Sequence, residues 1–488
     1  MSSLFAQIPT LPQPDNGLYE QKFKYDIGSV IPSDLNGDGL TDFISRTQYV
    51  SKDSTIHIEF RLYNQSGGEP YWEFNTNVLS RYNENFVPSG RKFGIGFSTY
   101  TDVPSISWDW DNDGKWEVYF IYFDLITSGW RHRIVTGTGQ TLIDAAIPSG
   151  CNWETRKLMT ALCTYRGVER VIVAEDGMSS GNVVMLEILN KQGKWSLNTV
   201  WLYNDRVANN KSLVSHDMIR TADVDLDGSD DEILLGGVVL NSDGSIRYTM
   251  DQVLGLKEGS YGRSDQVLLG YFHPNYPNDL VMIPGDDWVG GDWQIHIAAV
   301  FAKTGEKIFD SKIGTNSSEL GFDDHWHSGN FMTNKDGFFL TALDRSGEEW
   351  ARYEITKSFQ GLVSSGDTNH GKPDVYMTTT KWHDNDYDIP NIQGLTGSGV
   401  SIDLGGSGAE EIIEHRGESP ENKLTIRFNM DSDPDFPSRW KNFQYRKDAQ
   451  LLNSGYAQHW LGAIVGSDKN NDIVKPPLTP KNMQIKLK

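Results

Sequence analysis

One acidic motif, called here the acidic phrase, decides the fold. It occurs three times: DLNGDGLTD at residues 34–42, DWDNDGKWE at 109–117 and DVDLDGSDD at 223–231. Each copy has an oxygen-bearing side chain at positions 1, 3 and 5, a glycine at position 6 and a carboxylate at position 9. This spacing lets a short loop curl around a hard cation, and the glycine permits the sharp turn. Oxygen ligands in a flexible loop suit calcium better than magnesium or zinc, so the sequence predicts several structural Ca²⁺ ions.

Weaker copies of the phrase follow the full ones. Residues 366–377 keep three ligands but are one residue short, and residues 403–414 keep Asp403 and Glu411 without a side-chain ligand at position 3. We expect these weaker copies to be empty or only partly filled, and the cation in each full copy to tie the loop to the strand that follows. The predicted metal ligands of these loops are Asp34, Asn36, Asp38, Asp42, Asp109, Asp111, Asp113, Glu117, Asp223, Asp225, Asp227, Asp231, Asp367, Asn369 and Asp374.

Short apolar runs dominate the chain and often end in Gly, Asp or Asn, as in WEVYFIYF at 116–123 and DEILLGGVVL at 231–240. They are typical of strands punctuated by turns. Counting degenerate units before the strands near 170, 280 and 338 gives about eight units, each roughly long enough for four short strands. The sequence therefore predicts an all-β fold, an eight-bladed β-propeller with calcium-binding blade loops, or seven blades if one weak unit is miscounted.

We divide the chain into an amino-terminal extension (1–20), the propeller (21–466) and a polar, Pro-rich tail or clasp (467–488). The opening MSSLFAQIP resembles a start methionine added to a trimmed secretory remnant, so a signal peptide is expected to have been removed. We therefore expect a secreted, periplasmic or cell-surface protein, and a monomer. Two cysteines, Cys151 and Cys163, could bridge in an oxidising compartment, but two are too few for a disulfide framework.

Charge and composition exclude some partners and favour others. The formal net charge of −22 is offset by no basic stripe, which excludes nucleic acid as the expected partner. No apolar run is long enough for a membrane span. The 15 Trp, 20 Tyr and 48 Gly favour strands, and flat aromatic faces suit carbohydrate rings.

The acidic phrase followed by a strand resembles FG-GAP-type calcium blades. Three further segments narrow the resemblance: SHDMIRTADVDLDGSDDEILLGGVVLNSDG (215–244), GSYGRSDQVLLGYFHPNYPNDLVM (259–282) and YRKDAQLLNSGYAQHWLG (445–462). In this order they resemble the bacterial rhamnogalacturonan lyases, which fold as eight-bladed propellers. Ulvan lyases, propellers that act on another rhamnose–uronate polymer, are a related alternative.

The resemblance implies roles for a few residues. Tyr456 matches a functional Tyr of the family, and His216 and Asp265 match ligands of an active-face calcium ion. The chain departs from the family at Tyr261, where the family has His. The family's late Lys has no clear match in GLTGSGVSID (394–403), and the place of its Arg falls near DDHWHSGNF (323–331), which has His and Trp instead. The fold therefore transfers more safely than the chemistry.

The resemblance implies an acidic polysaccharide as the partner, which a lyase of this class would break by β-elimination at a uronate. A base removes the C5 proton, a cation neutralises the carboxylate, and an acid protonates the oxygen that leaves C4. For each residue a structural role is the alternative: a core tyrosine, a salt-bridged arginine or a solvated polar loop. The predicted catalytic residues are Tyr456, His327, His325, Lys381 and Arg446, and the predicted substrate-binding residues are Trp326, Trp382, His383, Tyr261, Arg263 and Trp288.

Three functions compete on this evidence. The first is a secreted lyase of a rhamnose- and uronate-containing polysaccharide, favoured by the His-, Trp- and Lys-bearing stretches 323–330 and 381–388, which we interpret as loops. The second is a non-catalytic, calcium-stabilised propeller for glycan binding or adhesion, favoured by the missing family residues. A glycoside hydrolase ranks last, because no isolated carboxylate pair stands out.

Overall fold

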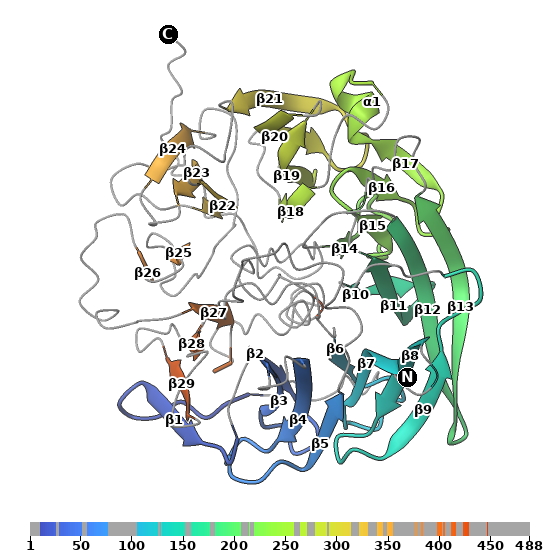
Figure 1. Ribbon diagram of the computed structural model, residues 1–488, viewed down its shortest axis with the longest axis vertical. Coiled ribbons are helices and arrows are strands. Elements are labelled where there is room, and N and C mark those ends of the chain that lie inside the picture. Colours follow the sequence, from blue (N-terminus) through green and yellow to red (C-terminus); the bar gives the residue numbers. More distant parts are fainter. Residues whose placement is uncertain are drawn as a thin grey trace.

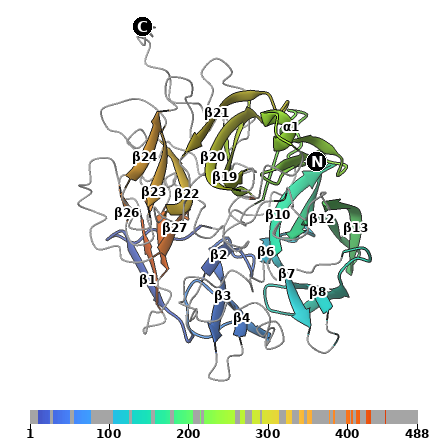
Figure 2. The same cartoon turned by 45° about the horizontal axis from the view of Figure 1, so that its top comes forward.

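The computed structural model shows an all-β chain whose sheets follow one another around a ring (Figures 1 and 2). The described residues are 10–25, 29–50, 56–76, 105–124, 127, 129–151, 158–175, 181–205, 214, 219–257, 264–270, 279–289, 292–313, 322–329, 339–344, 349–354, 376–377, 382–383, 398–402, 404–405, 411–415, 423–428 and 447.

Three four-stranded sheets come first along the chain. They comprise β2 (Ser29–Ser33), β3 (Asp42–Val50), β4 (Ile56–Tyr63) and β5 (Trp72–Thr76); β6 (Ser105–Trp108), β7 (Glu117–Asp124), β8 (Gly129–Val135) and β9 (Thr141–Ala146); and β10 (Leu158–Tyr165), β11 (Val168–Glu175), β12 (Gly181–Lys191) and β13 (Lys194–Asp205).

Four more sheets continue the ring. They comprise β14 (Arg220–Ala222), β15 (Glu232–Leu234), β16 (Val238–Leu240) and β17 (Ile246–Thr249); β18 (Ser264–Gly270), β19 (Val281–Val289), β20 (Asp292–Phe301) and β21 (Lys307–Ile313); β22 (Phe322–Gly329), β23 (Phe339–Asp344) and β24 (Glu349–Glu354); and β25 (Tyr376–Met377) with β26 (Trp382–His383).

Within each of these sheets the strands pair antiparallel in sequence order, and Figure 1 shows the first strand of most sheets nearest the centre of the ring. Radial repetition of small antiparallel sheets is the architecture of a β-propeller, and it leaves only short, protected edges. The predicted all-β, propeller-like fold is therefore confirmed. In the described parts of the chain there are eight separate sheets, of which six are four-stranded.

The ring is closed by a sheet that joins one early strand to three late strands of the chain. Its order is β1 (Leu18–Lys22), β29 (Lys423–Arg427), β28 (Glu411–His415) and β27 (Ser398–Ile402). Lys423 forms an ion pair with Glu20 across a sequence separation of 403 residues. The strand β1 spans residue 20, where the sequence interpretation places the boundary between extension and propeller.

Neighbouring sheets meet through a repeated glycine–aromatic contact at their outer hairpins. Gly139, Gly244 and Gly305 each have a positive φ in the turn before the last strand of their sheet. A Cβ atom on them would lie within 2.0 Å of Trp72, 2.8 Å of Trp201 and 2.9 Å of Tyr248, each on the last strand of the preceding sheet. Glycine is therefore required at these turns both by backbone conformation and by the close approach of an aromatic ring.

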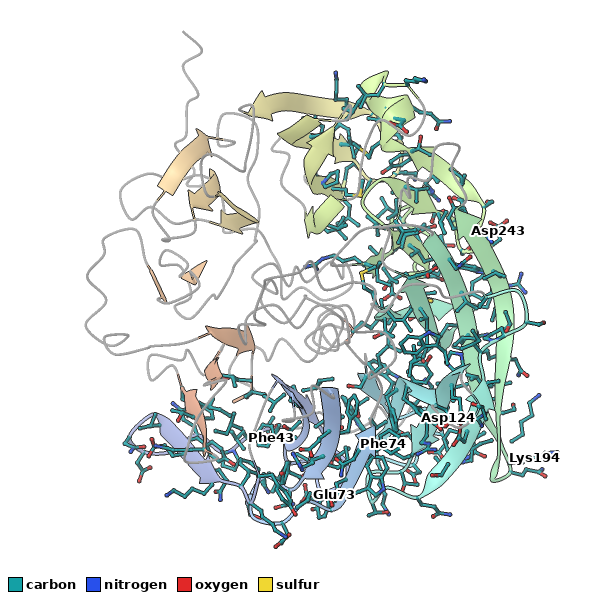
Figure 3. All side chains as sticks on the ribbon, viewed as in Figure 1. Phe43, Glu73, Phe74, Asp124, Lys194 and Asp243 are labelled. Atoms are coloured by element: carbon teal, nitrogen blue, oxygen red, sulfur yellow. The ribbon has the colours of Figure 1, made fainter. Side chains whose placement is uncertain are left out.

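The hydrophobic core lies between successive sheets. One cluster joins β6–β8 to β10–β12, and another joins β14–β17 to β18–β20. Phe60 of β4 stacks on Phe120 of β7 with ring centroids 5.2 Å apart. Figure 3 shows Phe43 and Phe74 within the sheets and Glu73 and Lys194 at the outer rim.

Both cysteines, Cys151 and Cys163, are buried and free, so the disulfide considered from the sequence does not form. The helix α1 (Met250–Leu254) begins with a capping box between Thr249 and Gln252. Nothing helical in the described part of the chain is long and apolar enough to cross a membrane.

Candidate metal centres

The three full acidic loops share one backbone conformation. Position 4 has a positive φ in each loop, at Gly37 (78°), Asn112 (59°) and Leu226 (68°). Position 6 also has a positive φ in each, and it is Gly39, Gly114 and Gly228. The predicted glycine turn is therefore confirmed, and the structure adds a second left-handed residue that the sequence pattern does not reveal, because only the first loop has glycine there.

The carboxylate at position 1 organises each loop from inside. Asp34 accepts backbone N–H groups of Gly37 and Gly39, at 2.8 and 3.0 Å. Asp109 accepts those of Asp113 and Gly114, both at 3.1 Å, and Asp223 accepts those of Asp227 and Gly228, at 2.9 and 3.1 Å. These bonds hold the loop curled with its other acidic side chains close together.

A second carboxylate closes each loop from the first residue of the following strand. In each of the three sheets, the residue with this carboxylate pairs with the last residue of the preceding strand: Asp42 with Ser33, Glu117 with Trp108, and Glu232 with Ala222. The weaker copy at 403–414 has the same arrangement, in which Glu411 pairs with Ile402. In the last three of these four, the N–H at position 2 donates to the carboxylate, from Trp110 (3.1 Å), Val224 (2.9 Å) and Leu404. The carboxylate therefore ties the loop to the strand that it begins.

In the first loop the closing carboxylate is buried and only half used. Asp42 is 0% exposed, and its Oδ1 accepts from the side chain of Asn64 and the backbone of Gln65, both at 3.2 Å. Its Oδ2 is buried without a hydrogen-bond partner. Burial raises the pKa of Asp42 to about 7, with Asp38 and Asp34 adding to the rise. A buried carboxylate oxygen of this kind, beside two further carboxylates, fits a cation as its partner.

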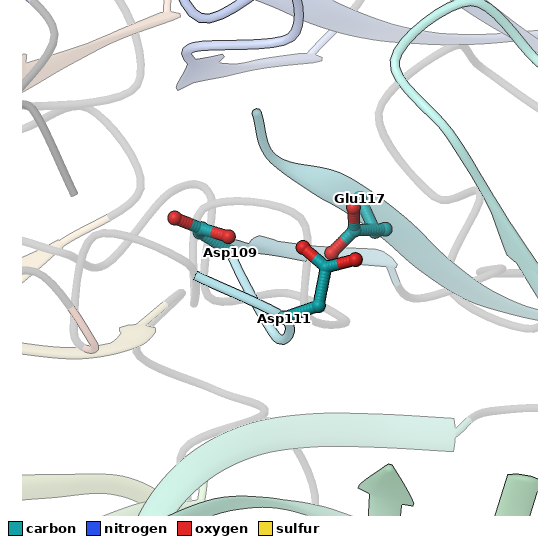
Figure 4. Close-up of side chains that lie close together, drawn as sticks. All are labelled: Asp109, Asp111 and Glu117. Atoms are coloured by element: carbon teal, nitrogen blue, oxygen red, sulfur yellow. The ribbon is translucent and has the colours of Figure 1, made fainter. Parts of the chain in front are cut away.

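The second loop brings three carboxylates together. One oxygen each of Asp109, Asp111 and Glu117 lie within 4.8 Å of one another, and Figure 4 shows the three groups converging. Burial raises the pKa of Glu117 to about 9 and that of Asp109 to about 6, and the neighbouring carboxylates add to both rises. Among the described residues no Lys or Arg forms an ion pair with this group. The donor set and its uncompensated charge therefore fit a hard divalent cation.

The third loop differs in its ligands. The carboxylates that lie within 4.8 Å are Asp223, Asp225 and Glu232, not the predicted Asp231. The loop 223–231 is one residue longer than 109–116, so position 10 rather than position 9 begins the next strand. Arg247 also enters the group, where its Nη2 donates to Asp225 Oδ2 at 2.8 Å and to Glu232 Oε1 at 3.1 Å.

Other predicted site residues are placed only by their backbone. Asp265 lies on β18, Trp288 on β19, His325, Trp326 and His327 on β22, and Trp382 and His383 on β26, and their side chains are outside the described set. The sequence interpretation of 323–330 and 381–388 as loops is wrong for 323–329, which lie on β22 paired with β23, and for Trp382–His383, which form β26 paired with β25. The remaining predicted residues lie outside the described residues: His216, Tyr261, Arg263, Asp367, Asn369, Asp374, Lys381, Arg446 and Tyr456.

Sequence reasoning missed three contributors to these loops. Glu232 was hidden by the adjacent Asp231, because two successive acidic residues do not reveal which one begins the strand. Arg247 is 15 residues after Glu232 and carries no local signal. Asn190, near the end of β12 in the next sheet, donates to Asp111 Oδ2 at 2.8 Å, a contact that depends on the packing of successive sheets.

Comparisons with known proteins bear on the fold. No protein-family model matches the sequence, and no curated protein matches it. The crystal structure of rhamnogalacturonan lyase YesW is similar, with 14% identity and a TM-score of 0.64 over 92% of this chain and 80% of that one.

Two further lyases are similar to the same degree. The Bacillus licheniformis rhamnogalacturonan lyase PL11 has 15% identity and a TM-score of 0.63 over 92% of this chain and 79% of its own. The exotype rhamnogalacturonan lyase YesX has 14% identity and a TM-score of 0.62 over 90% and 80%. The resemblance predicted from the sequence is confirmed as a distant one, and at this identity it establishes the fold.

Proposed function

We propose that this protein is a polysaccharide lyase that cleaves a rhamnose- and uronate-containing polymer by β-elimination. The observation that carries the proposal is the likeness to three rhamnogalacturonan lyases, which extends over 90–92% of this chain. A fold alone does not determine chemistry. The abundance of Trp and Tyr adds support, because flat aromatic faces suit carbohydrate rings.

The chemistry requires three functions on one face of the ring. A base takes the C5 proton of the uronate, a cation withdraws charge from its carboxylate, and an acid protonates the leaving oxygen at C4. We assign proton transfer to Tyr456, with His325, His327, Lys381 and Arg446 as the other candidates for these roles. Loops at one face of a propeller can bring such residues together from several sheets, because the scaffold is rigid.

We further propose that the ring has eight blades and that Ca²⁺ is the cation of the first two acidic loops. The eight sheets among the described residues support the blade number. The buried, unpartnered Asp42 Oδ2 and the converging Asp109, Asp111 and Glu117 support the ions. Their role is structural, since they neutralise carboxylates that join a loop to its strand. A polymer substrate places the protein outside the cytoplasm, and we propose that it acts there as a monomer.

The test is the ultraviolet absorbance of the product. β-Elimination leaves a carbon–carbon double bond beside the uronate carboxylate, so absorbance rises as rhamnogalacturonan or ulvan is cleaved. We expect the rise with the wild-type protein, its loss in Tyr456→Phe, and its retention in Tyr165→Phe. Tyr165 is a matched control because its ring packs against Arg166 and Arg170 at the end of β10, and the ring remains in Phe.

The outcomes separate the candidates. Turnover retained in Tyr456→Phe would remove Tyr456 from the mechanism but leave the lyase in place. No rise on any uronate polymer, with the protein shown to be folded and loaded with calcium, would contradict the lyase. It would favour the second candidate, a calcium-stabilised propeller that binds glycans, which the departures at 261–265 and 394–403 support.

A further inference from the structure

We propose that the guanidinium of Arg247 is the resident cation of the third acidic loop, so that this loop keeps its shape without a metal ion. The first two loops, in contrast, depend on one. This inference rests on the calcium ions proposed for those two loops and separates the three copies of the phrase into two kinds.

Arg247 is held in place on every side. Its Nη2 bridges Asp225 Oδ2 and Glu232 Oε1, at 2.8 and 3.1 Å. Its Nε donates to Asn241 Oδ1 at 2.8 Å, and its Nη1 donates to the carbonyl of Lys303 at 3.3 Å. The side chain is 15% exposed. A guanidinium fixed in this way by two carboxylates and two neutral acceptors is a built part of the loop, because each of its three nitrogens has a partner.

The oxygen that Arg247 uses on Glu232 is the one that a metal would need. Glu117 and Glu232 occupy the same register position, and each gives Oε2 to the N–H at position 2 of its loop. In Glu117 the other oxygen is left for a cation. In Glu232 the other oxygen, Oε1, already accepts from Arg247. The positive charge that the second loop lacks is therefore supplied in the third by the protein.

Strand register identifies what replaces Arg247 in the second loop's sheet. In β16–β17 the pairs Leu240–Ile246 and Val239–Tyr248 leave Arg247 as the extra residue of a β-bulge. In β8–β9 the pairs Val135–Thr141 and Ile134–Ile143 leave Leu142 as the extra residue of the same bulge. Leu142 packs against the apolar core. One bulge position therefore carries Arg beside the third loop and Leu beside the second.

Two more cationic side chains contact the third loop. Lys303 Nζ donates to the backbone carbonyl of Asp225 at 2.8 Å, and the buried Lys447 forms an ion pair with Asp230. No Lys or Arg forms an ion pair with the acidic side chains of the first two loops among the described residues. Asp225 Oδ1 is still buried without a partner, and it is the oxygen through which a metal could bind beside Arg247. The experiment therefore tests whether the third loop binds calcium through its carboxylates.

The test is the number of calcium ions retained per chain after gel filtration, measured by elemental analysis on the full chain. Asp109→Asn is expected to lower the number by one, because it removes a ligand of the second loop. Asp223→Asn is expected to leave it unchanged. Arg247→Leu, which copies the residue at the second sheet's bulge, is expected to raise it by one.

A loss of one ion in Asp223→Asn, matching the loss in Asp109→Asn, would overturn the proposal. Asp225→Asn removes a second candidate ligand of the third loop and is also expected to leave the number of calcium ions unchanged. It provides a second test if Arg247→Leu does not fold. A wild-type chain that retains no calcium would overturn the calcium proposal itself, and with it the contrast between the loops. The failures of the two proposals are therefore distinguishable.

Discussion

Gly139 packs directly on the indole ring of Trp72 in the preceding sheet, so closely that a Cβ atom at Gly139 would lie 2.0 Å from the ring carbons. The turn that holds Gly139 has a left-handed backbone, with a φ of 87°. The same contact recurs between Gly244 and Trp201 and between Gly305 and Tyr248. Neighbouring sheets can therefore pack this closely at these turns because glycine has no side chain.

Replacing this glycine should destabilise the protein far more than its backbone conformation requires. Gly193 provides the matched control, because it has a φ of 81° at an equivalent turn and nothing lies within 4 Å of its Cβ position. We expect Gly193→Ala to lower the free energy of unfolding by about 1 kcal/mol, and Gly139→Ala to lower it by about 2–4 kcal/mol. Thermal melting of both variants measures the difference. Equal shifts would show that Trp72 moves aside without cost.

Leu226 is strained in the third loop, and relief of that strain should stabilise the protein. Its φ is 68°, a conformation that leucine rarely adopts, whereas the second loop has Asn112 at the same position with a φ of 59°. We expect Leu226→Asn to raise the free energy of unfolding by about 1 kcal/mol and Asn112→Leu to lower it by a similar amount. Both changes are read by thermal melting at saturating calcium. Shifts of the same sign in the two variants would contradict the explanation.

Histidine 132 should make the protein less stable in mild acid. His132 lies buried against Tyr119, whose hydroxyl is 2.7 Å from His132 Nδ1, and burial lowers the pKa of His132 to about 3. The unfolded chain therefore binds a proton below pH 6.5 that the folded chain refuses, so stability is lost as pH falls from 6.5 towards 3. At pH 5 the loss is about 2 kcal/mol.

The variant His132→Gln should remove this part of the pH dependence. Melting temperatures of wild type and variant are compared at pH 7 and pH 5, so that contributions from other groups cancel in the difference. Tyr119→Phe is the control, because it removes the hydroxyl but leaves the imidazole buried. An unchanged difference in His132→Gln would mean that His132 is protonated in the folded protein at pH 5.

Replacing Lys447 alone should destabilise the protein more than replacing Lys447 and its partner Asp230 together. Its side chain is 1% exposed and pairs with Asp230, which is 12% exposed, and it also donates to Thr164. Lys447→Met leaves a carboxylate without its cation and is expected to destabilise by about 3–5 kcal/mol. The double variant Lys447→Met, Asp230→Asn should recover part of this loss in a denaturant titration. Additive losses would show that the two side chains are not coupled.

Much of the fold follows from local sequence. The acidic phrase predicts the glycine turn at position 6, and strands follow it at Asp42 and Glu117 where the pattern places them. Apolar runs with turn residues between them predict short antiparallel strands, because alternation and punctuation are local properties of a chain.

Other features depend on contacts between distant segments and leave no such signal. The strand β1 finds its partner only at β29, and Arg247 reaches the third loop only because β17 pairs with β16, which in turn pairs with β15. A single extra residue moves the closing carboxylate from Asp231 to Glu232, and the sequence pattern alone favours Asp231. The segment DDHWHSG reads as polar loop because its composition is polar, yet strand pairing with β23 makes it β22.

The pairing of β1 with β29 has a consequence for biosynthesis. A ribosome that releases β1 must add about 400 more residues before its partner exists, since Glu20 and Lys423 are 403 positions apart. At translation rates of about 5–20 residues per second, β1 waits about 20–80 s as a nascent, unpaired strand. Its sequence, LYEQK, carries Glu20 and Lys22, and charges of this kind hinder aberrant pairing with other nascent chains. The strand β1 is thus synthesised first and paired last, and its charged residues allow it to remain exposed in the meantime.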